Sequence, residues 1–190
     1  SAAYSRCMVL VITLLLVGAV LLLARLFDAV TDPWLGNPSC PPGWSRPEAL
    51  KPVDVILLSH AHADHSTDVV SLARETGARV HICRLSSAEG VNMVRAAKQQ
   101  GLRISCDVAI HHAHLSEMDI GYFDPNCNLT PPLRSQRDRD ALRAALADGG
   151  IDALCSDHTP VDDDAKQLPF GEAETGATGV ELLLPLALKW

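Results

Sequence analysis

Histidine and aspartate side chains are concentrated in the string H-A-H-A-D-H, which occupies residues 60–65 of this 190-residue chain. His60 and His62 are two positions apart, so both imidazoles can reach one ion from an extended or tightly turned segment. Asp64 and His65 follow in the adjacent turn and can reach a second ion. Zinc accepts these nitrogen and oxygen ligands, and a pair of such ions can activate a water for hydrolysis. The string therefore predicts a site for one or two zinc ions, the alternative being a solvated loop that has this composition by chance.

The segments that would position this string alternate between apolar runs and amphipathic stretches. Strands are expected at residues 53–59, 79–85, 103–110 and 151–156, and helices at 68–76, 87–100, 137–147 and 180–188. This alternation predicts an α/β fold with a parallel sheet. Polar groups follow the four expected strands, namely His60 to His65, Arg84, His111 with His112, and Asp157 with His158. Because sites in such folds lie at the carboxyl ends of the strands, these groups are expected to form one ancestral active site.

The remaining histidines and the cysteines are expected to be structural. His81 lies inside an apolar, strand-like run and is expected to be a packed core histidine. Cys83, Cys106 and Cys155 occupy similar runs, and the six cysteines include no C-x-x-C pair. Reduced thiols in a domain from a reducing compartment are the simplest interpretation.

The composition favours a membrane contact and argues against a nucleic-acid partner. The net charge of −7 is unlike that of a nucleic-acid-binding domain. Residues 7–24 are uncharged and almost entirely apolar, and a helix of that length would span about 27 Å, enough to cross a bilayer core. We therefore expect residues 1–27 to form a transmembrane or signal-anchor helix, with a cleaved signal peptide or a buried core helix as alternatives. A Pro- and Gly-rich linker would occupy residues 28–52, and the α/β domain at 53–190 would be cytoplasmic.

Three stretches within residues 31–80 point to a known family, namely D-P-W-L-G-N-P, V-D-V-I-L-L-S-H-A-H-A-D-H-S and V-V-S-L-A-R-E-T-G-A. They resemble the metallo-β-lactamase-fold hydrolases. By this resemblance the metal ligands would be His60, His62, Asp64 and His65. Asp64 would also take part in catalysis. The family's further metal histidine, bridging aspartate and last histidine have no matching context in residues 81–190, and its two strands before the motif are replaced by the apolar span.

A second set of motifs covers residues 72–190. In order they are V-H-I-C-R-L-S-S-A-E-G-V, D-V-A-I-H-H-A-H-L-S, T-P-P-L-R, C-S-D-H-T-P-V and K-Q-L-P-F-G-E-A-E-T-G-A-T-G-V-E. They are similar to the C-terminal half of a dihydroorotase, an amidohydrolase-superfamily β/α barrel. The resemblance implies four of the eight barrel units, that is, a partial TIM-like barrel. It also implies that His111 is a metal ligand and that Asp157 is the metal-bound general acid/base.

Three positions depart from the dihydroorotase pattern. Arg84 stands where a second metal histidine is expected, Thr130 where a substrate-binding asparagine is expected, and Val161 where a histidine is expected. A guanidinium cannot ligate zinc and repels it, and valine offers no hydrogen bond to a substrate carboxylate. These losses resemble the non-catalytic dihydroorotase-like chains that accompany aspartate carbamoyltransferase in some bacteria. The resemblance implies that Asp157 is vestigial and that the partner is an aspartate carbamoyltransferase. The open strand edges of a half barrel make a second copy of the chain the other expected partner.

The two resemblances meet near residues 72–80, in L-A-R-E-T-G-A, as in a chimera. The main hypothesis is an inactive dihydroorotase-like protein with a supporting role in pyrimidine biosynthesis. An active chain would be a metal-dependent hydrolase, either a cyclic amidohydrolase or a metallo-β-lactamase-type enzyme. A membrane-anchored chain without enzymatic activity is the third alternative. One amidohydrolase ligand set also remains open, made of His60, His62, His111 and Asp157.

Overall fold

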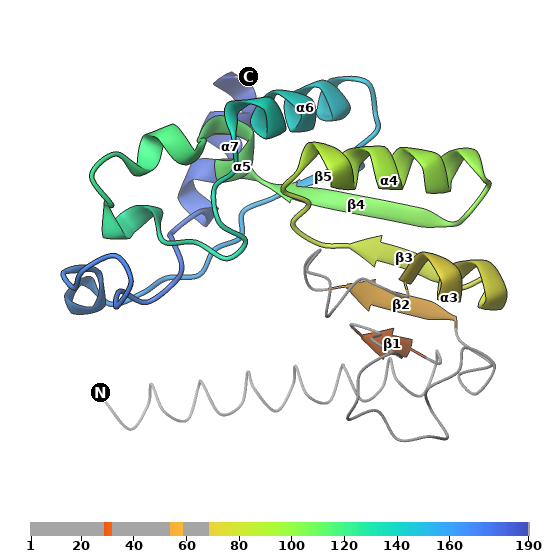
Figure 1. Ribbon diagram of the computed structural model, residues 1–190, viewed down its shortest axis with the longest axis horizontal. Helices are drawn as coiled ribbons and strands as arrows, with labels where there is room; N and C mark the ends of the chain where they lie inside the picture. The colour runs from red at the N-terminus through yellow and green to blue at the C-terminus, as the bar shows by residue number, and fades with distance from the viewer. Residues whose placement is uncertain (1–28, 32–53, 59–68, 190) are drawn as a thin grey trace.

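The computed structural model describes residues 29–31, 54–58 and 69–189, and these form a parallel sheet with helices packed on it (Figure 1). The strands are β1 (Ala29–Thr31), β2 (Val55–Leu58), β3 (Arg79–Ile82), β4 (Ile104–Ala109) and β5 (Ala153–Cys155). They lie side by side in chain order, and every neighbouring pair is parallel. The predicted α/β fold with a parallel sheet is therefore confirmed. Sequential parallel order is also the arrangement of consecutive units in a β/α barrel.

Helices connect the strands of this sheet. They are α3 (Val69–Thr76), α4 (Ala88–Gln99), α5 (Ile110–His114), α6 (Gln136–Ala147) and α7 (Val180–Lys189), with short 3-10 helices at Glu117–Ile120, Pro125–Cys127 and Asp163–Lys166. Serine residues fix where two of the long helices begin. The Ser87 hydroxyl accepts from the Gly90 amide, and the Ser135 hydroxyl accepts from the Asp138 amide. Each serine satisfies an amide that has no partner inside the helix.

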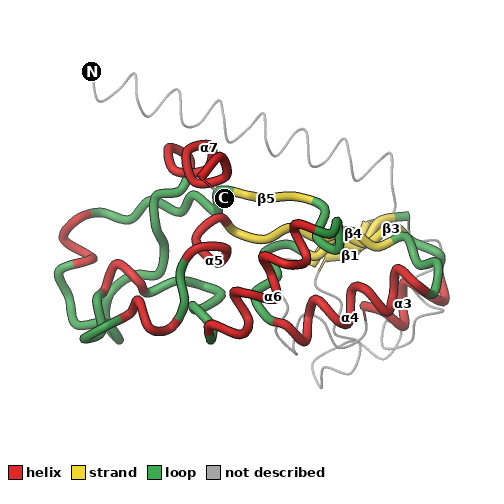
Figure 2. Tube along the Cα trace, turned by 90° about the horizontal axis from the view of Figure 1, so that it is seen from above, coloured by secondary structure: helices red, strands yellow, loops and turns green. Residues whose placement is uncertain are grey.

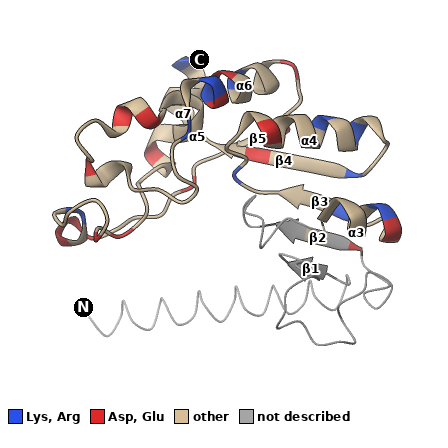
Figure 3. Cartoon of the chain, viewed as in Figure 1, with Lys and Arg blue, Asp and Glu red and all other residues tan. Residues whose placement is uncertain are grey.

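The hydrophobic core lies between the sheet and the helices α3, α4 and α6, which cover one face of the sheet (Figure 2). Alternate strand residues supply one side of this core, namely Val80, Ile82, Cys106 and Val108. Leu72, Val94 and Leu142 supply the helix side and are almost completely buried. Basic and acidic residues both occur along these helices (Figure 3). One of the ion pairs there joins Arg95 of α4 to Asp148 after α6.

The opposite face of β3 and β4 carries polar side chains. Side chains alternate across a strand, so His81 points away from its buried neighbours Val80 and Ile82. Ser105 is the register partner of His81 on β4. Asp107 lies two residues further along β4 and so shares this face. The polar face therefore brings His81, Ser105 and Asp107 close together on two neighbouring strands.

The two edge strands of the sheet, β1 and β5, have only 3 residues each. Among the described residues, β1 pairs only with β2 and β5 pairs only with β4, so these five strands do not close into a barrel. Ala29–Thr31 belong to the segment expected to be a linker, yet they pair in register with β2. Two of them are β-branched, which suits a strand.

β3, β4 and β5 are shorter than predicted. β3 ends at Ile82 instead of residue 85, because the backbone of Arg84 takes a positive φ of 55° that interrupts the extended conformation. β5 begins at Ala153 instead of residue 151. The expected membrane span at residues 7–24 lies outside the described part of the chain. None of the helices within residues 69–189 has the length and apolar character required to cross a bilayer.

Candidate functional site

Three polar side chains meet at the carboxyl ends of β3, β4 and β5. Arg84 lies two residues after β3, His111 lies in the first turn of α5 directly after β4, and Asp157 lies two residues after β5. Arg84 and Asp157 have positive φ angles of 55° and 44°. Residues other than glycine rarely adopt such angles, and at functional sites these angles often aim a side chain. The expected convergence of polar groups therefore occurs for these three strands. The group at His60 to His65 lies outside the described residues.

Arg84 and Asp157 form the central contact of this site. Nη1 of Arg84 lies 3.3 Å from Oδ1 of Asp157. The same Nη1 donates to the backbone carbonyl of Thr130 at 3.1 Å. Nε2 of His111 lies 3.6 Å from Oδ2 of Asp157, which is too long for a hydrogen bond. This imidazole nitrogen is buried, and no residue in the described part of the chain forms a hydrogen bond with it.

The electrostatics of the site leave arginine as the cation that faces Asp157. Burial, with smaller contributions from His112 and the Arg84 cation, lowers the pKa of His111 to about 3. His111 is therefore neutral near pH 7, and its approach to Asp157 is not an ion pair. The side chains of His111 and Asp157 are only 11% and 13% exposed. A guanidinium in this poorly solvated position interacts with the carboxylate more strongly than it would in water.

The described residues do not fit a divalent ion at this end of the sheet. His111 and Asp157 offer ligand atoms, but the Arg84 guanidinium lies on the carboxylate. A guanidinium has donors only, cannot ligate a metal and repels one. The other predicted ligands are His60, His62, Asp64 and His65. They lie outside the described residues, so the structure does not place them relative to Asp157.

A small cavity lies against the ion pair. Its volume is about 110 Å³, whereas pockets for small-molecule ligands usually measure roughly 300–1,000 Å³. Arg84, Thr130 and Asp157 line it together with Leu129, Thr159, Thr175, Gly176 and Ala177. The cavity therefore has room for a few waters and not for a substrate of ordinary size.

Three other histidines at this end connect loops. The Nε2 atom of His112 lies 3.2 Å from the carbonyl of Pro132, and that of His114 lies 3.2 Å from the carbonyl of Leu186 in α7. Nδ1 of His158 accepts from the amide of Gly179, just before α7. These contacts tie the strand ends to the loop before α6 and to α7. They leave His112, His114 and His158 with structural roles.

A second cluster of side chains was missed by the sequence analysis. His81, Cys83 and Asp107 bring one potential ligand atom each to within 4.8 Å of one another, and within the described residues they are the one such group of three. His81 was expected to be a packed core histidine, but its side chain is 34% exposed and its Nε2 lies 2.9 Å from Oδ2 of Asp107. The signal was present in V-H-I-C, because the period of two places His81 and Cys83 on one face.

Comparison with protein families and curated proteins gives two results. The Beta-lactamase superfamily domain family matches residues 25–149, beyond the junction predicted near 72–80. A dihydroorotase-like protein of Pseudomonas aeruginosa is 39% identical over 138 residues, which are 70% of this chain and 33% of that protein. A dihydroorotase of Geobacter sp. is 42% identical over 120 residues, which are 63% of this chain and 28% of that protein. The chain thus spans about a third of the length of these relatives.

Solved structures give the same picture of the fold. A D-hydantoinase (dihydropyrimidinase) from Thermus sp. has a TM-score of 0.60 and 26% identity, and the match covers 67% of this chain and 29% of that chain. The inactive dihydroorotase-like domain of a Chaetomium thermophilum CAD-like multifunctional protein has a TM-score of 0.50 and 23% identity over 70% of this chain and 36% of that chain. At 23% identity the second likeness concerns the fold alone. The chain therefore belongs to the Beta-lactamase superfamily domain family by residues 25–149, and it combines that match with a dihydroorotase-like, amidohydrolase region.

Proposed function

We propose that this chain is a dihydroorotase-like protein that does not hydrolyse dihydroorotate and that instead supports an aspartate carbamoyltransferase assembly in pyrimidine biosynthesis. One observation carries the proposal, namely the 3.3 Å contact between Arg84 and Asp157. The resemblance to dihydroorotases gives Asp157 the role of general acid/base. In this chain a carboxylate oxygen of Asp157 faces the guanidinium, which cannot ligate a metal and occupies the position where the resemblance expects a metal histidine.

Thr130 and Val161, which stand where the dihydroorotase pattern has an asparagine and a histidine, also support a chain that does not hydrolyse dihydroorotate. The backbone carbonyl of Thr130 accepts from Arg84, so this residue is engaged with the ion pair. Val161 lines a cavity of about 540 Å³ next to Lys166 and Gly176, and its side chain has no group that can hydrogen-bond a carboxylate. Binding energy for a charged substrate depends on such placed polar groups.

The partner side of the proposal draws on two features. The inactive dihydroorotase-like domain from Chaetomium thermophilum, whose fold this chain resembles, is part of a multifunctional protein. In this chain, α7 exposes Val180, Leu182, Leu184 and Leu188. A helix with so many exposed apolar side chains gains by contact with another surface.

Enzyme assays and sedimentation test the two parts separately. The full chain should show no more dihydroorotate turnover than its Asp157→Asn variant, with and without added zinc. Turnover above that of the variant would contradict the inactive assignment. Analytical ultracentrifugation of the chain mixed with a bacterial aspartate carbamoyltransferase should show a common boundary. Independent sedimentation of the two proteins would contradict the assembly role without affecting the assignment as inactive.

A second candidate function is metal-dependent hydrolysis through His60, His62, Asp64 and His65. The family match at residues 25–149 includes this string and favours it. In this alternative the string binds one or two zinc ions, and Asp64 helps to activate the water. Purified protein should then contain up to two zinc ions per chain, and the double variant His60→Ala, His62→Ala should lose them. Full metal content in the double variant would exclude the string as the metal site.

A further inference from the structure

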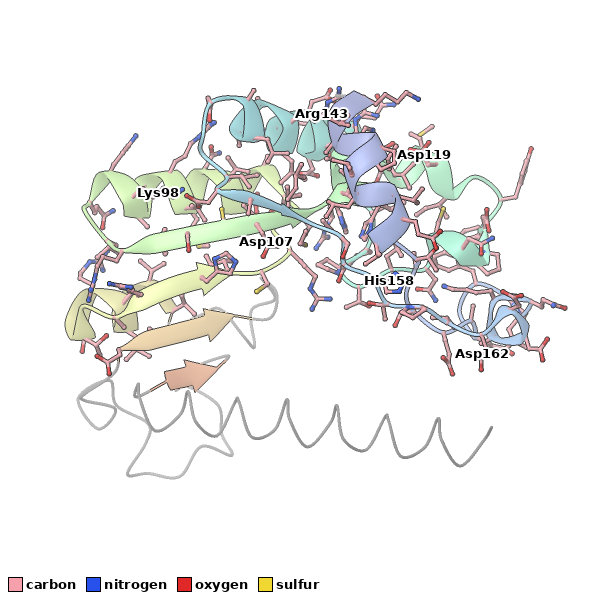
Figure 4. The ribbon with its side chains drawn as sticks, turned by 180° about the vertical axis from the view of Figure 1, so that it is seen from behind. Lys98, Asp107, Asp119, Arg143, His158 and Asp162 are labelled. Carbon is pink, nitrogen blue, oxygen red and sulfur yellow. The ribbon has the colours of Figure 1, made fainter. Side chains whose placement is uncertain are left out.

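His81 and Asp107 lie on the polar face of the sheet, and Cys83 directly follows β3, next to Arg84 in the chain. His81 belongs to β3 and Asp107 to β4, on the part of the strand next to β5 (Figure 4). Their ligand atoms and the Cys83 sulfur are all within 4.8 Å of one another. Imidazole nitrogen, thiolate sulfur and carboxylate oxygen are the three ligand types that zinc takes in proteins.

His81 and Asp107 are each held by hydrogen bonds to residues outside the cluster. These bonds leave Nε2 of His81 and Oδ2 of Asp107 facing each other. Nδ1 of His81 lies 2.8 Å from the Ser105 hydroxyl, so its Nε2 faces Asp107. Oδ1 of Asp107 accepts from the Arg84 amide at 2.8 Å and from the Cys155 thiol at 3.2 Å, which leaves Oδ2 toward His81. Metal-binding histidines and carboxylates usually have such supporting partners, which fix the ring and the carboxylate in place.

The distances require only a small adjustment to accept an ion. Around a tetrahedral zinc, ligand nitrogen and oxygen lie roughly 3.3 Å apart and sulfur lies about 3.6 Å from either. Nε2 of His81 and Oδ2 of Asp107 are 2.9 Å apart, so they would separate by about 0.4 Å. The Cys83 sulfur now lies within 4.8 Å of the ligand atoms of His81 and Asp107, and it would move closer to both of them. One thiolate and one carboxylate also neutralise the two charges of the ion.

We propose that His81, Cys83 and Asp107 bind one divalent cation of the zinc class, with a water in the fourth position. This goes beyond the proposed function and does not depend on it, because none of the three ligands is Arg84, His111 or Asp157, although Asp107 accepts from the Arg84 amide. The side chain of His81 is 34% exposed, so the ion and its water can enter. A bound ion would join β3 to β4 on the face opposite the helices α3, α4 and α6. Cys155 would remain a hydrogen-bond donor to Asp107 instead of a ligand.

Cobalt is the probe that separates this site from others in the chain. Co²⁺ added to metal-free full-length protein should produce a thiolate-to-cobalt charge-transfer absorption at about one equivalent, and Zn²⁺ should displace it. Cys83→Ser should abolish the absorption. Cys127→Ser is the matched control that should keep it, since Cys127 belongs to the 3-10 helix at Pro125–Cys127 and not to the cluster. Ser105→Ala should keep the absorption but weaken binding by roughly 10- to 100-fold.

Alkylation gives a readout that needs no variant. In the unmodified chain, Zn²⁺ should protect Cys83 from a maleimide while Cys127 remains reactive, as mapped by mass spectrometry. This measurement decides the matter if Cys83→Ser fails to fold. No charge-transfer absorption in the unmodified chain, an absorption that persists in Cys83→Ser, or equal labelling of Cys83 with and without Zn²⁺ would each overturn the proposal. Binding by the His60 to His65 string alone would produce no thiolate absorption, so it counts against this site.

Discussion

Acid should destabilise the protein through His111, and replacing His111 by asparagine should remove that part of the acid sensitivity. Burial lowers the pKa of this imidazole from its ordinary 6.5 to about 3. At pH 5 the folded protein therefore keeps His111 neutral, whereas the unfolded chain protonates it. Since the unfolded state binds more protons, the free energy of unfolding falls as the pH falls below about 6.5.

The expected magnitude follows from the size of the pH step. Each pKa unit corresponds to about 1.36 kcal/mol, so the loss between pH 6.5 and pH 5 is about 2 kcal/mol. That is a large part of the roughly 5–15 kcal/mol by which domains are stable. Urea unfolding of the unmodified chain and of His111→Asn, at pH 7 and pH 5 with a chelator present, measures it. Asparagine does not titrate, so the variant should lose about 2 kcal/mol less than the unmodified chain over this step.

The comparison between the two proteins isolates His111 from its neighbour. Burial also lowers the pKa of His112, and this residue contributes to the acid sensitivity of both proteins. Its effect therefore largely cancels in the difference. If the two proteins lost the same stability within about 0.5 kcal/mol, His111 would be solvated or protonated in the folded state, and the account of Arg84 as the cation facing Asp157 would fail.

Three other outcomes are expected. In a double-mutant cycle, Arg84→Met and Asp157→Asn should each destabilise the chain by about 2–3 kcal/mol and together by about 1–2 kcal/mol less than their sum; urea unfolding measures this, and additive effects would mean that the pair does not interact. Deleting residues 1–27 should release the protein from carbonate-washed membranes, and release of the intact chain by the same wash would contradict the proposed anchor. Residues 28–190 alone should sediment as an oligomer, because β1 and β5 are open edges among the described strands, and a stable monomer would contradict the partial-barrel assignment.

Most of the regular structure could be predicted from the sequence because it depends on local patterns. An apolar run gave β2, and the helix expected at 87–100 corresponds to α4. Helix α5 and the 3-10 turns that follow it were not predicted. They are short, lack a periodic apolar face, and depend on contacts with α6 and α7 that the local sequence does not encode.

The candidate site was predictable in its location and not in its geometry. Polar residues after each apolar run indicated Arg84, His111 and Asp157. Nothing in the sequence indicated that two of them take positive φ angles, because arginine and aspartate rarely do so. The interaction of His81 with Asp107 was missed because apolar neighbours suggested a packed core, while alternation across the strand places that histidine on the polar face.

Asp107 connects the two clusters of polar residues, and this connection explains how the backbone of Arg84 is held at the end of β3. One carboxylate oxygen lies 2.9 Å from His81, and the other accepts from the Arg84 amide at 2.8 Å. The second contact supports the unusual backbone of Arg84, which aims the guanidinium at Asp157. A histidine placed at position 84 alone would follow the same backbone but would leave Asp157 without its cation. If the chain is inactive as proposed, metal chemistry involving Asp157 would therefore require a complete ligand set as well as the loss of the arginine.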